Sequence, residues 1–392
     1  MQHSSPQATT SGSLGIGMVG YAFMGRAHSQ GWLGAREFFS PPLWPQLRTV
    51  AGRNRAGAQE LADHFGWGGV TTDWQDLLSD DGIGLVDICT PGDTHAEIAI
   101  AALEAGRHVL VEKPMANTVA EAERMAAAAE RAAARGQIAM VGFTYRRVPA
   151  VQLARQIVAE GKLGTIRLIR AEYLQDWLVD SAAPFTWRSD RELAGSGALG
   201  DIGAHAIDLA QFVSGELITE VSGLLDTAVA TRTDAEGVAQ EVTVDDTAAF
   251  LTRFQGGAVG NFTATRMATG RKNSLRLEIS GELGAISFDL EDLNVLQLQD
   301  TSEGDRAGFR RIDVTEPSHR YLSGWWPPGH ALGYQHGFTH QALDLLNGIA
   351  AGENPRPTFA DALGVQRVLQ SVEDSARDRS WVAVDQLART DN

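Results

Sequence analysis

The sequence predicts an α/β protein of two domains: a doubly wound parallel sheet, followed by an α+β domain with a large, mainly antiparallel open sheet. Three observations support this fold class. The chain has 392 residues, more than one hydrophobic core normally organises. Its first part alternates short apolar runs with Ala-rich amphipathic stretches, as strands alternate with helices around a parallel sheet. Beyond about residue 150, strand-like segments follow one another closely, which indicates hairpins.

Residues 14–150 are predicted to form the first domain. Two segments between its strands, 94–106 and 119–136, have the apolar spacing of amphipathic helices. Residues 1–13 are polar and lack the basic start and apolar core of a signal peptide, so we expect a disordered lead-in there. The strand candidates are the five apolar runs 14–19, 47–52, 85–89, 108–112 and 138–143.

Residues 151–392 are predicted to form the second domain, which would bind substrate and contact other subunits. A helix is expected at 155–164, and alternating polarity predicts a half-buried strand at 166–177. The polar stretch 231–246 is predicted to be a surface loop, and residues 335–377 have a helical pattern. Four further strand candidates are 248–254, 258–266, 274–280 and 284–290.

Charge and composition exclude several classes of function. A formal net charge of −16 argues against nucleic acid as a partner, because such binding depends on clustered Lys and Arg. No apolar run reaches the roughly 18–20 residues that cross a bilayer, so no membrane association is expected. The one cysteine, Cys89, allows no intrachain disulfide, which is typical of a cytoplasmic protein. An anionic ligand would need local backbone dipoles or arginines to attract it.

A glycine-rich turn follows the first predicted strand. The spacing G-x-G-x-x-G occurs at Gly15, Gly17 and Gly20, but that frame leaves no strand before the turn. We therefore choose the frame Gly20, Ala22 and Gly25. In this frame Gly20 makes the turn, backbone approaches a pyrophosphate at Ala22, and Gly25 lets the helix pack on the strand. The phosphates would lie at the helix N-terminus, so the turn predicts a dinucleotide cofactor.

The end of the second strand bears on the choice of cofactor. An Asp or Glu at this place normally holds the ribose 2′-hydroxyl, but here Gly52 is followed by Arg53 and Arg55. An arginine can pair with a 2′-phosphate, although both arginines could simply be solvated. The sequence therefore predicts NAD(P)H as cofactor and favours NADP.

Two loops follow strands of the first domain at the edge of the sheet where ligands bind. In the first, Glu112 and Lys113 come directly after the strand 108–112, and Pro114 forces Lys113 away from helical geometry. Lys113 could equally be a solvated loop lysine. The second loop would border a nicotinamide ring with Thr90, Pro91 and His95.

A Gly-rich segment at 195–212 contains an acid and an imidazole four residues apart. On a helix, Asp201 and His205 share one face, and Ile202, Leu209 and Phe212 can pack beside them. The same spacing could supply two metal ligands. No third ligand is clearly placed, so no metal site is predicted.

Polar side chains near the predicted cleft are candidates for substrate contacts. Gln175, Asp176 and Trp177 end the strand that should face the cofactor. Arg146 and Arg188 could donate to substrate hydroxyls or to nicotinamide. Three more candidates, each of which could be structural, are Tyr145, Tyr334 and His336.

These motifs together resemble the Gfo/Idh/MocA family, the glucose–fructose oxidoreductase, inositol dehydrogenase and MocA group of NAD(P)-dependent oxidoreductases. The matching segments are GYAFMG (20–25), TP…H (90–95), EKP (112–114), YR (145–146) and G-x-x-x-D-x-x-x-H (197–205). Within the family, YLQDW (173–177), FTWR (185–188) and AGSGALGD (194–201) are similar to levoglucosan dehydrogenase-like sugar dehydrogenases.

The resemblance implies a function and a role for each matching residue. The protein would transfer a hydride between a nicotinamide cofactor and a hydroxyl or keto carbon of a sugar, glycoside or cyclitol. Lys113 would contact substrate and cofactor, His205 would be the general base in oxidation, and Asp201 would orient the substrate or the imidazole. The implied cofactor contacts are Gly20, Tyr21, Ala22, Phe23, Met24, Gly25, Arg53, Thr90, Pro91, His95, Glu112, Lys113 and Arg188.

Alternatives remain open within and outside this family. One alternative is an inositol dehydrogenase. A second is imine or biliverdin-type reduction or trans-dihydrodiol oxidation, but such relatives depart from the Lys, Asp and His set. A third is a non-catalytic dinucleotide-binding regulator, which would be expected to lack Lys113 or His205. An open sheet in the second domain leaves one face to cover, and relatives in the family use that face to form dimers or tetramers. A homodimer or homotetramer is therefore expected.

Overall fold

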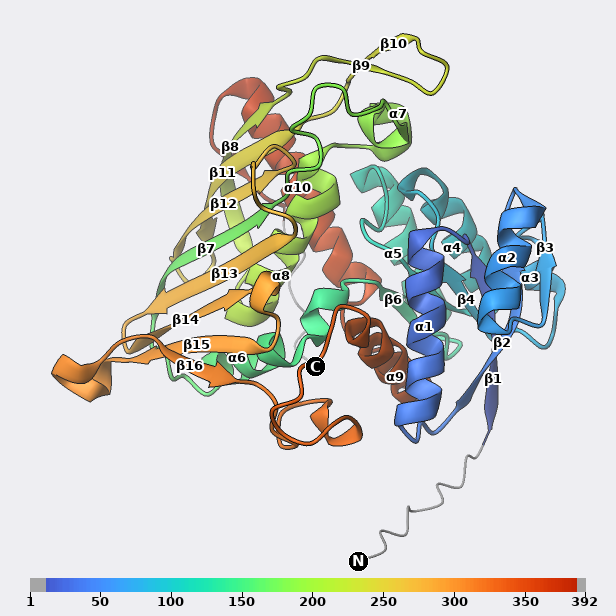
Figure 1. Cartoon of the computed structure of the whole chain (residues 1–392), viewed down its shortest axis with the longest axis horizontal. Coiled ribbons are helices and arrows are strands. Elements are labelled where there is room, and N and C mark those ends of the chain that lie inside the picture. Colours follow the sequence, from blue (N-terminus) through green and yellow to red (C-terminus); the bar gives the residue numbers. More distant parts are fainter. Residues whose placement is uncertain (1–11, 386–392) are drawn as a thin grey trace, which may run out of the picture.

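The first domain is built on a six-stranded parallel sheet (Figure 1). The computed structural model describes residues 12–385, so most of the lead-in predicted for residues 1–13 lies outside the described residues, and Ser13 already begins β1. The strand order is β3-β2-β1-β4-β5-β6, and every neighbouring pair is parallel. The strands are β1 (Ser13–Val19), β2 (Trp44–Ala51), β3 (Gly69–Thr71), β4 (Leu85–Ile88), β5 (His108–Val111) and β6 (Ala139–Val141).

Helices cover both faces of this sheet, which explains why its strands read as continuous apolar runs. Ile16, Val86 and Val109 are fully buried. Chain order reverses between β1 and β4, and this is where open α/β sheets bind ligands. The helices of the first domain are α1 (Phe23–Phe38), α2 (Arg55–Phe65), α3 (Asp76–Ser79), α4 (His95–Glu104) and α5 (Val119–Ala133).

The second domain carries a nine-stranded sheet in the order β16-β15-β14-β13-β7-β12-β11-β8-β17. The pair β7–β12 is parallel and the other neighbours are antiparallel, so the sheet is mixed but mostly antiparallel. Its strands are β7 (Ile166–Leu174), β8 (Ile218–Asp226), β11 (Thr247–Phe254), β12 (Val259–Thr265), β13 (Ser274–Gly281), β14 (Gly284–Asp289), β15 (Val295–Asp300), β16 (Arg310–Asp313) and β17 (Val382–Ala383).

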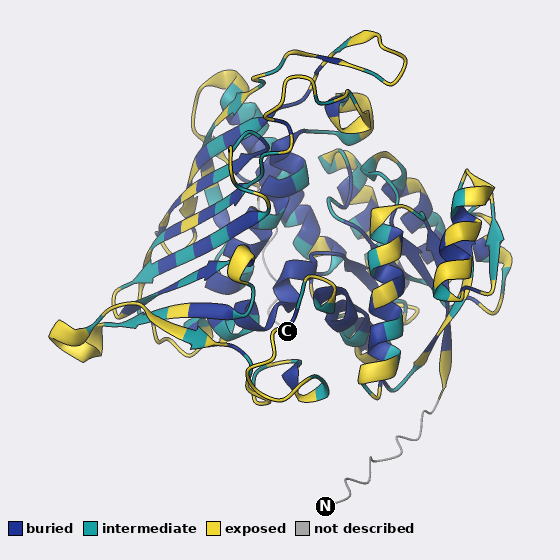
Figure 2. Cartoon of the chain, in the orientation of Figure 1, coloured by how far each residue is buried: buried dark blue, intermediate teal, exposed yellow. Residues whose placement is uncertain are grey.

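One face of the nine-stranded sheet packs against helices and the opposite face carries none of the described helices (Figure 1). Buried residues alternate with more exposed ones along strands such as β11 and β12 (Figure 2), as expected for a sheet that is covered on one face. The helices of this domain are α6 (Pro149–Ala159), α7 (Arg191–Ala194), α8 (Ala204–Ser214), α9 (His336–Ala351) and α10 (Phe359–Asp378).

The stretch 231–246, predicted as a surface loop, instead contains a short hairpin. Strands β9 (Thr231–Thr233) and β10 (Ala239–Glu241) pair antiparallel. The prediction was wrong because Arg232 is buried and its guanidinium donates to the carbonyls of Leu178 and Asp180 at 2.8 and 2.9 Å. The polar composition of the stretch therefore did not reveal that Arg232 is buried and hydrogen-bonded to the neighbouring loop.

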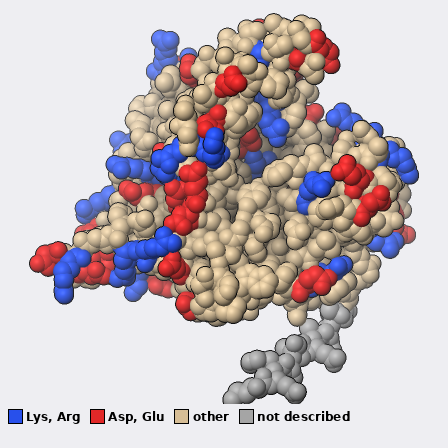
Figure 3. All heavy atoms as spheres, in the orientation of Figure 1, with Lys and Arg blue, Asp and Glu red and all other residues tan. Residues whose placement is uncertain are grey.

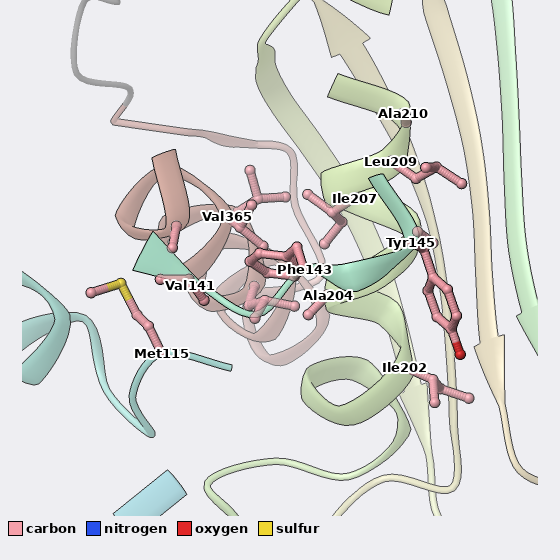
Figure 4. Packing of buried hydrophobic residues seen from close by; sticks show 14 of the residues in the cluster. Met115, Val141, Phe143, Tyr145, Ile202, Ala204, Ile207, Leu209, Ala210 and Val365 are labelled. Carbon is pink, nitrogen blue, oxygen red and sulfur yellow. The ribbon is translucent and has the colours of Figure 1, made fainter. Parts of the chain in front are cut away.

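The two domains share one hydrophobic core. Figure 4 shows Phe143 from the first domain packed with Ile207 of α8 and Val365 of α10. Helix α9 returns to the first domain and packs on α1. Gly31 makes this approach possible, because a Cβ there would lie 2.8 Å from the Phe338 carbonyl. The boundary predicted near residue 150 is therefore a change in architecture and not a break in packing.

Candidate active site

A cleft of about 810 Å³ lies between the two domains. Loops from the carboxyl ends of the parallel strands form one wall, and β7, α8 and the segment 186–196 form the other. The face seen in Figure 3 is hollowed between the domains, and most of the surface around the hollow is uncharged. The chain's net negative charge is therefore not concentrated at the mouth of the cleft.

The glycine-rich turn has the geometry of a phosphate-binding site. Gly15 and Gly17 lie inside β1, as the chosen frame requires. Gly20 has a φ of +108°, and a Cβ there would lie 2.8 Å from the Cys89 carbonyl. A Cβ on Gly25 would meet the Gly20 carbonyl 2.5 Å away. Helix α1 begins directly after Ala22 with no side-chain cap, so its first N–H groups are available to an anion.

The end of β2 has an aromatic cover and no acid. The Tyr21 ring lies so close to Gly52 and Gly57 that a Cβ on them would meet it at 2.3 and 2.6 Å. Arg53 is exposed and does not line the cleft, while the Asn54 side chain accepts from Ala56 N at 3.0 Å and caps α2. A dinucleotide ribose at this edge would meet these groups.

The loop after β4 is tied to the loop after β5. Thr90, Pro91 and His95 all line the cleft. The His95 ring nitrogens lie 2.8 Å from the Thr90 carbonyl and 3.0 Å from the Pro114 carbonyl. Burial lowers the pKa of this imidazole despite the two carbonyls. His95 therefore packs between the two loops, and each of its ring nitrogens faces a protein carbonyl.

Lys113 and Asp201 meet across the cleft. The Lys113 ammonium donates to Asp201 Oδ1 at 2.9 Å and to its carbonyl at 2.7 Å. The buried Arg266 guanidinium donates to Asp201 Oδ2 at 2.8 Å. Burial alone would raise the pKa of the Asp201 carboxyl, but the two cations outweigh it and hold the pKa far below its usual range. Asp201 is thus a fixed anion that positions Lys113.

His205 lies beside this ion pair in an aromatic setting. A turn of π-helix (Leu199–Gly203) carries Asp201 and leads into α8, where His205 is the second residue. The imidazole packs on Tyr145, with ring centroids 4.7 Å apart, and edge-on to Phe143. Burial and the Lys113 ammonium lower its pKa well below the usual value, against the pull of Asp201. His205 is therefore a neutral imidazole facing the cleft.

A chain of hydrogen bonds runs from His205's aromatic neighbour along the end of β7. The Tyr145 and Tyr173 hydroxyls lie 2.8 Å apart, and Tyr173 donates to Asn273 Oδ1 at 2.7 Å. Gln175 Nε2 donates to the same oxygen at 2.9 Å, and the Trp177 indole donates to Gln175 Oε1 at 2.9 Å. All five side chains line the cleft, so they form a polar floor with fixed orientation.

The structure places three predicted substrate contacts outside the cleft. Arg146 is buried and pairs with Asp208, its Nε 2.8 Å from a carboxylate oxygen. Asp176 pairs with Lys272 at 2.8 Å and accepts from Gly270 N, so it holds a surface loop. His336 accepts from Gly333 N at 2.8 Å and packs edge-on to Trp325. Each side chain is occupied by a local partner.

Most of the remaining predicted residues line the cleft, but Gly20, Tyr21 and Gly25 of the turn do not. Exposed Arg188 stands over the ring of its neighbour Trp187, and Tyr334 stacks on Phe23 with centroids 6.2 Å apart. The other cleft residues among the predictions are Ala22, Met24, Glu112, Lys113, Tyr145 and Gln175.

Sequence reasoning missed three residues of the site: Arg266, Tyr173 and Asn273. Arg266 directly follows β12, and its signal was a lone arginine at the end of an apolar strand. Its contact with Asp201 needs the parallel pairing of β12 with β7, which local patterns do not reveal. In the described part of the chain, neither Asp201 nor His205 belongs to a group spaced to hold a metal ion.

The parallel sheet, the glycine turn and the paired Lys113 and Asp201 define an NAD-binding oxidoreductase. Residues 14–143 match the model described as "Oxidoreductase family, NAD-binding Rossmann fold", and residues 151–287 match "GFO/IDH/MocA C-terminal domain". The chain belongs to the Gfo/Idh/MocA family. Among the described residues, no helix is long and apolar enough to cross a membrane.

Individual relatives match nearly the whole chain. Levoglucosan dehydrogenase of Pseudarthrobacter phenanthrenivorans is 40% identical, over 96% of this chain and 99% of its own. A structure of levoglucosan dehydrogenase in complex with NADH and levoglucosan has a TM-score of 0.91, covering 95% of this chain and 100% of that one. The oxidoreductase domain protein from Kribbella flavida has a TM-score of 0.94 and 59% identity, with 95% and 100% coverage.

Proposed function

We propose that this protein oxidises a hydroxyl group of a sugar, using a nicotinamide dinucleotide bound at the Gly20 turn. The observation that carries the proposal is a buried imidazole, His205, that faces the same cleft as an ammonium fixed by Asp201. Oxidation of an alcohol needs a proton acceptor beside the carbon that loses hydride, and a cation beside the developing alkoxide.

His205 is the general base in the forward direction and the general acid in the reverse. Its depressed pKa keeps the imidazole neutral and ready to accept a proton from the sugar hydroxyl. Phe143 and Tyr145 support the ring, so its orientation is set before the substrate arrives. The low pKa also makes proton release from the product complex easy.

Lys113 stabilises negative charge on the substrate oxygen. Its ammonium is partly buried and held by Asp201, so no reorganisation is needed as charge develops. Arg266 keeps the Asp201 carboxylate in place from the other side. When bound, the nicotinamide ring supplies the hydride acceptor in oxidation and the donor in reduction.

The residues of the turn fit a dinucleotide. Gly20 provides a cradle that a Cβ would fill, and Ala22, Phe23 and Met24 present the start of α1 to the cleft. Thr90 and Pro91 would border the nicotinamide. These residues bind and orient the cofactor, while His205 and Lys113 act on the substrate.

NAD(H) is the cofactor we propose for the reaction. The levoglucosan dehydrogenase structure holds NADH, and no comparison favours the NADP that the arginines after β2 led us to expect. Arg53 is exposed near the edge where the ribose would lie, so NADP(H) is the competitor to measure alongside it.

The proposed substrate class is a sugar or glycoside. The polar floor formed by Tyr173, Asn273 and Gln175 offers fixed donors and acceptors for hydroxyl groups. Trp177 and Trp187 are partly exposed at the cleft and offer apolar faces to a pyranose ring. Levoglucosan is the first substrate to test because the relative named above acts on it. Inositols are the second, because the same base and cation would serve a cyclitol.

A turnover assay tests this proposal. Purified protein is incubated with NAD⁺ or NADP⁺ and with levoglucosan, several glucosides and inositols, and reduced cofactor is followed by absorbance. The proposal expects turnover of at least one sugar with NAD⁺. Binding of NADH without turnover of any sugar or cyclitol would favour a dinucleotide-binding regulator instead.

Assembly and compartment complete the proposal. The helix-free face of the nine-stranded sheet is the surface we propose for contact between copies, giving a homodimer or homotetramer. The protein is proposed to act in the cytoplasm, on the grounds of its single cysteine.

A further inference from the structure

A buried chain of three ionisable side chains runs beneath the glycine turn. It begins at Asp87 in β4, passes through His28 in α1, and ends at Glu112 after β5. His28 Nδ1 lies 2.9 Å from Asp87 Oδ1, and His28 Nε2 lies 3.0 Å from Glu112 Oε1. The three side chains are almost completely buried, so they interact without solvent screening.

His28 must carry charge in this arrangement. A neutral imidazole has one N–H, whereas both ring nitrogens here face a carboxylate oxygen, so only the imidazolium satisfies both. Burial alone would lower the pKa of His28, but the Asp87 carboxylate outweighs it and the pKa lies well above its usual value. Both nitrogens are therefore occupied, which leaves none to bind a metal together with Asp87 and Cys89.

The chain ends on the backbone of Lys113. Glu112 Oε1 accepts from His28, and Glu112 Oε2 accepts from the Lys113 N–H at 3.2 Å. Gly142 in the next loop leaves room for the carboxylate, because a Cβ there would lie 2.4 Å from Glu112 Oε1. The side chain that His28 fixes is thus the one that holds the start of the Lys113 loop.

We propose that His28 is a positioning residue for the reaction: as an imidazolium between Asp87 and Glu112, it holds the Glu112 carboxylate on the Lys113 backbone and so places the Lys113 ammonium on Asp201. The inference rests on the proposed function for its effect on turnover. Its effect on Lys113 itself is independent of any substrate.

Loss of the imidazolium would leave the Glu112 carboxylate buried without the cation at its Oε1. A buried carboxylate that has lost its paired cation is unfavourable, so Glu112 would move away from this position and release the Lys113 N–H. The Lys113 loop would then lose its fixed start.

Chemical labelling of lysine tests the positioning without turnover. The chain has three lysines, Lys113, Lys162 and Lys272, so an amine-selective reagent followed by mass spectrometry reports on each. Lys162 and Lys272 are exposed and serve as internal references. In His28→Gln, Lys113 should be labelled several-fold faster relative to these references than in wild type.

Trp32→Phe is the matched control. The Trp32 indole donates to Asp87 Oδ2 at 2.8 Å, so this variant removes a buried hydrogen bond from the same cluster but leaves His28 and Glu112 paired. Lys113 labelling should match wild type in Trp32→Phe. If His28→Gln does not fold, Asp87→Asn removes the anion that keeps His28 charged and should also expose Lys113.

Kinetics supply the second readout, once a sugar is turned over. We expect His28→Gln to lose kcat at least tenfold near neutral pH, with little change in sugar KM. Unchanged Lys113 labelling in a folded His28→Gln or Asp87→Asn protein overturns the proposal. Lys113 labelling in Trp32→Phe that is as fast as in His28→Gln overturns it as well. Absence of sugar turnover in wild type refutes only the proposed function, because the labelling result stands without it.

Discussion

At the scale of single residues, the site depends on one anion between two cations. Asp201 separates the Lys113 ammonium from the Arg266 guanidinium and pairs with both. The charges of Lys113 and Arg266 would repel each other without it, so neither would keep its position. Asp201 therefore acts through the placement of Lys113, and its effect can be measured apart from that of His205.

Asp201→Asn should lower kcat for sugar oxidation by at least tenfold and raise sugar KM, because the amide cannot hold both cations. NADH affinity should change much less, since Asp201 lies across the cleft from the glycine turn. Steady-state kinetics and calorimetric titration measure the two effects. Asp176→Asn is the matched control, because that carboxylate pairs with Lys272 away from the cleft. If Asp201→Asn and Asp176→Asn had equal kcat and KM, Asp201 would have no role in the reaction.

The pH dependence of oxidation follows from the state of His205. Burial and Lys113 place the pKa of the imidazole well below 6.5. A general base works when deprotonated, so the rate should be lost only as pH falls through this depressed value. The account predicts that kcat/KM for sugar oxidation stays level as pH falls through 6.5 and declines only at clearly lower pH. A decline centred at or above 6.5 would contradict the neutral-imidazole assignment.

The sequence revealed those site residues whose signal is local. Lys113 stands at the end of an apolar run, and Asp201 and His205 have helical spacing behind a Gly-rich lead-in. Arg266 gave only the weak signal of a lone arginine after a strand, and Asn273 gave none, because strand pairing brings both residues to the cleft. Arg146 was a candidate substrate contact because it follows a parallel strand. In the structure it pairs with Asp208 instead, and this tertiary contact could not be predicted from the local sequence.

At the scale of elements, the hairpin β9–β10 supports the loop that carries Trp187 and Arg188. Arg232 donates to carbonyls of residues 178, 180 and 183, and Phe185 N donates to the Thr233 carbonyl at 2.8 Å. The hairpin lies outside the cleft, yet it fixes one of the cleft's walls.

Arg232→Met should therefore loosen this wall without touching the chemistry. We expect sugar KM to rise several-fold, kcat to change little, and NADH affinity to stay as in wild type. Gln240→Ala in the partner strand is the control, because its side chain contacts Asp234 within the hairpin and not the loop. A fall in kcat with unchanged KM in Arg232→Met would show that the hairpin acts on catalysis directly.

The elements that sequence predicted best are those whose pattern is continuous. The first domain's apolar runs became β1, β2, β4, β5 and β6. β8 was missed because Gly223 and an exposed Leu224 interrupt its alternation. β3 and β17 are only 3 and 2 residues long, too short to show any period. The parallel pair β7–β12 could not be inferred from hairpin spacing, which predicts antiparallel neighbours only.

At the scale of the whole molecule, the helix-free face of the nine-stranded sheet is the surface that we propose as the contact between subunits. Leu224, Leu251 and Val259 are 66%, 44% and 42% exposed on it. Ion pairs such as Arg170–Glu278 and Arg276–Glu172 cross the same face. Mixed apolar and paired charged groups of this kind suit a two-fold contact in which the same surface meets itself.

Light scattering should give a mass of at least twice 42.1 kDa at micromolar concentration. Leu224→Lys combined with Leu251→Lys should lower that mass, because four or more ammonium groups would then meet across a two-fold contact. Val238→Lys is the control, since Val238 is 54% exposed on the hairpin and not on the sheet. A monomeric wild type would refute the proposed assembly.

The central claim is that His205 and Lys113 act together on a sugar hydroxyl, and kinetics of His205→Ala tests it most directly. The account predicts a loss of turnover of roughly 100- to 10,000-fold, with NADH affinity nearly unchanged on the same folded protein. His336→Ala, a histidine outside the cleft, should keep wild-type turnover. The double variant Lys113→Ala/His205→Ala should be little slower than the slower single variant, as for groups that work as a unit. A His205→Ala enzyme that retains more than about a tenth of wild-type turnover would contradict the account.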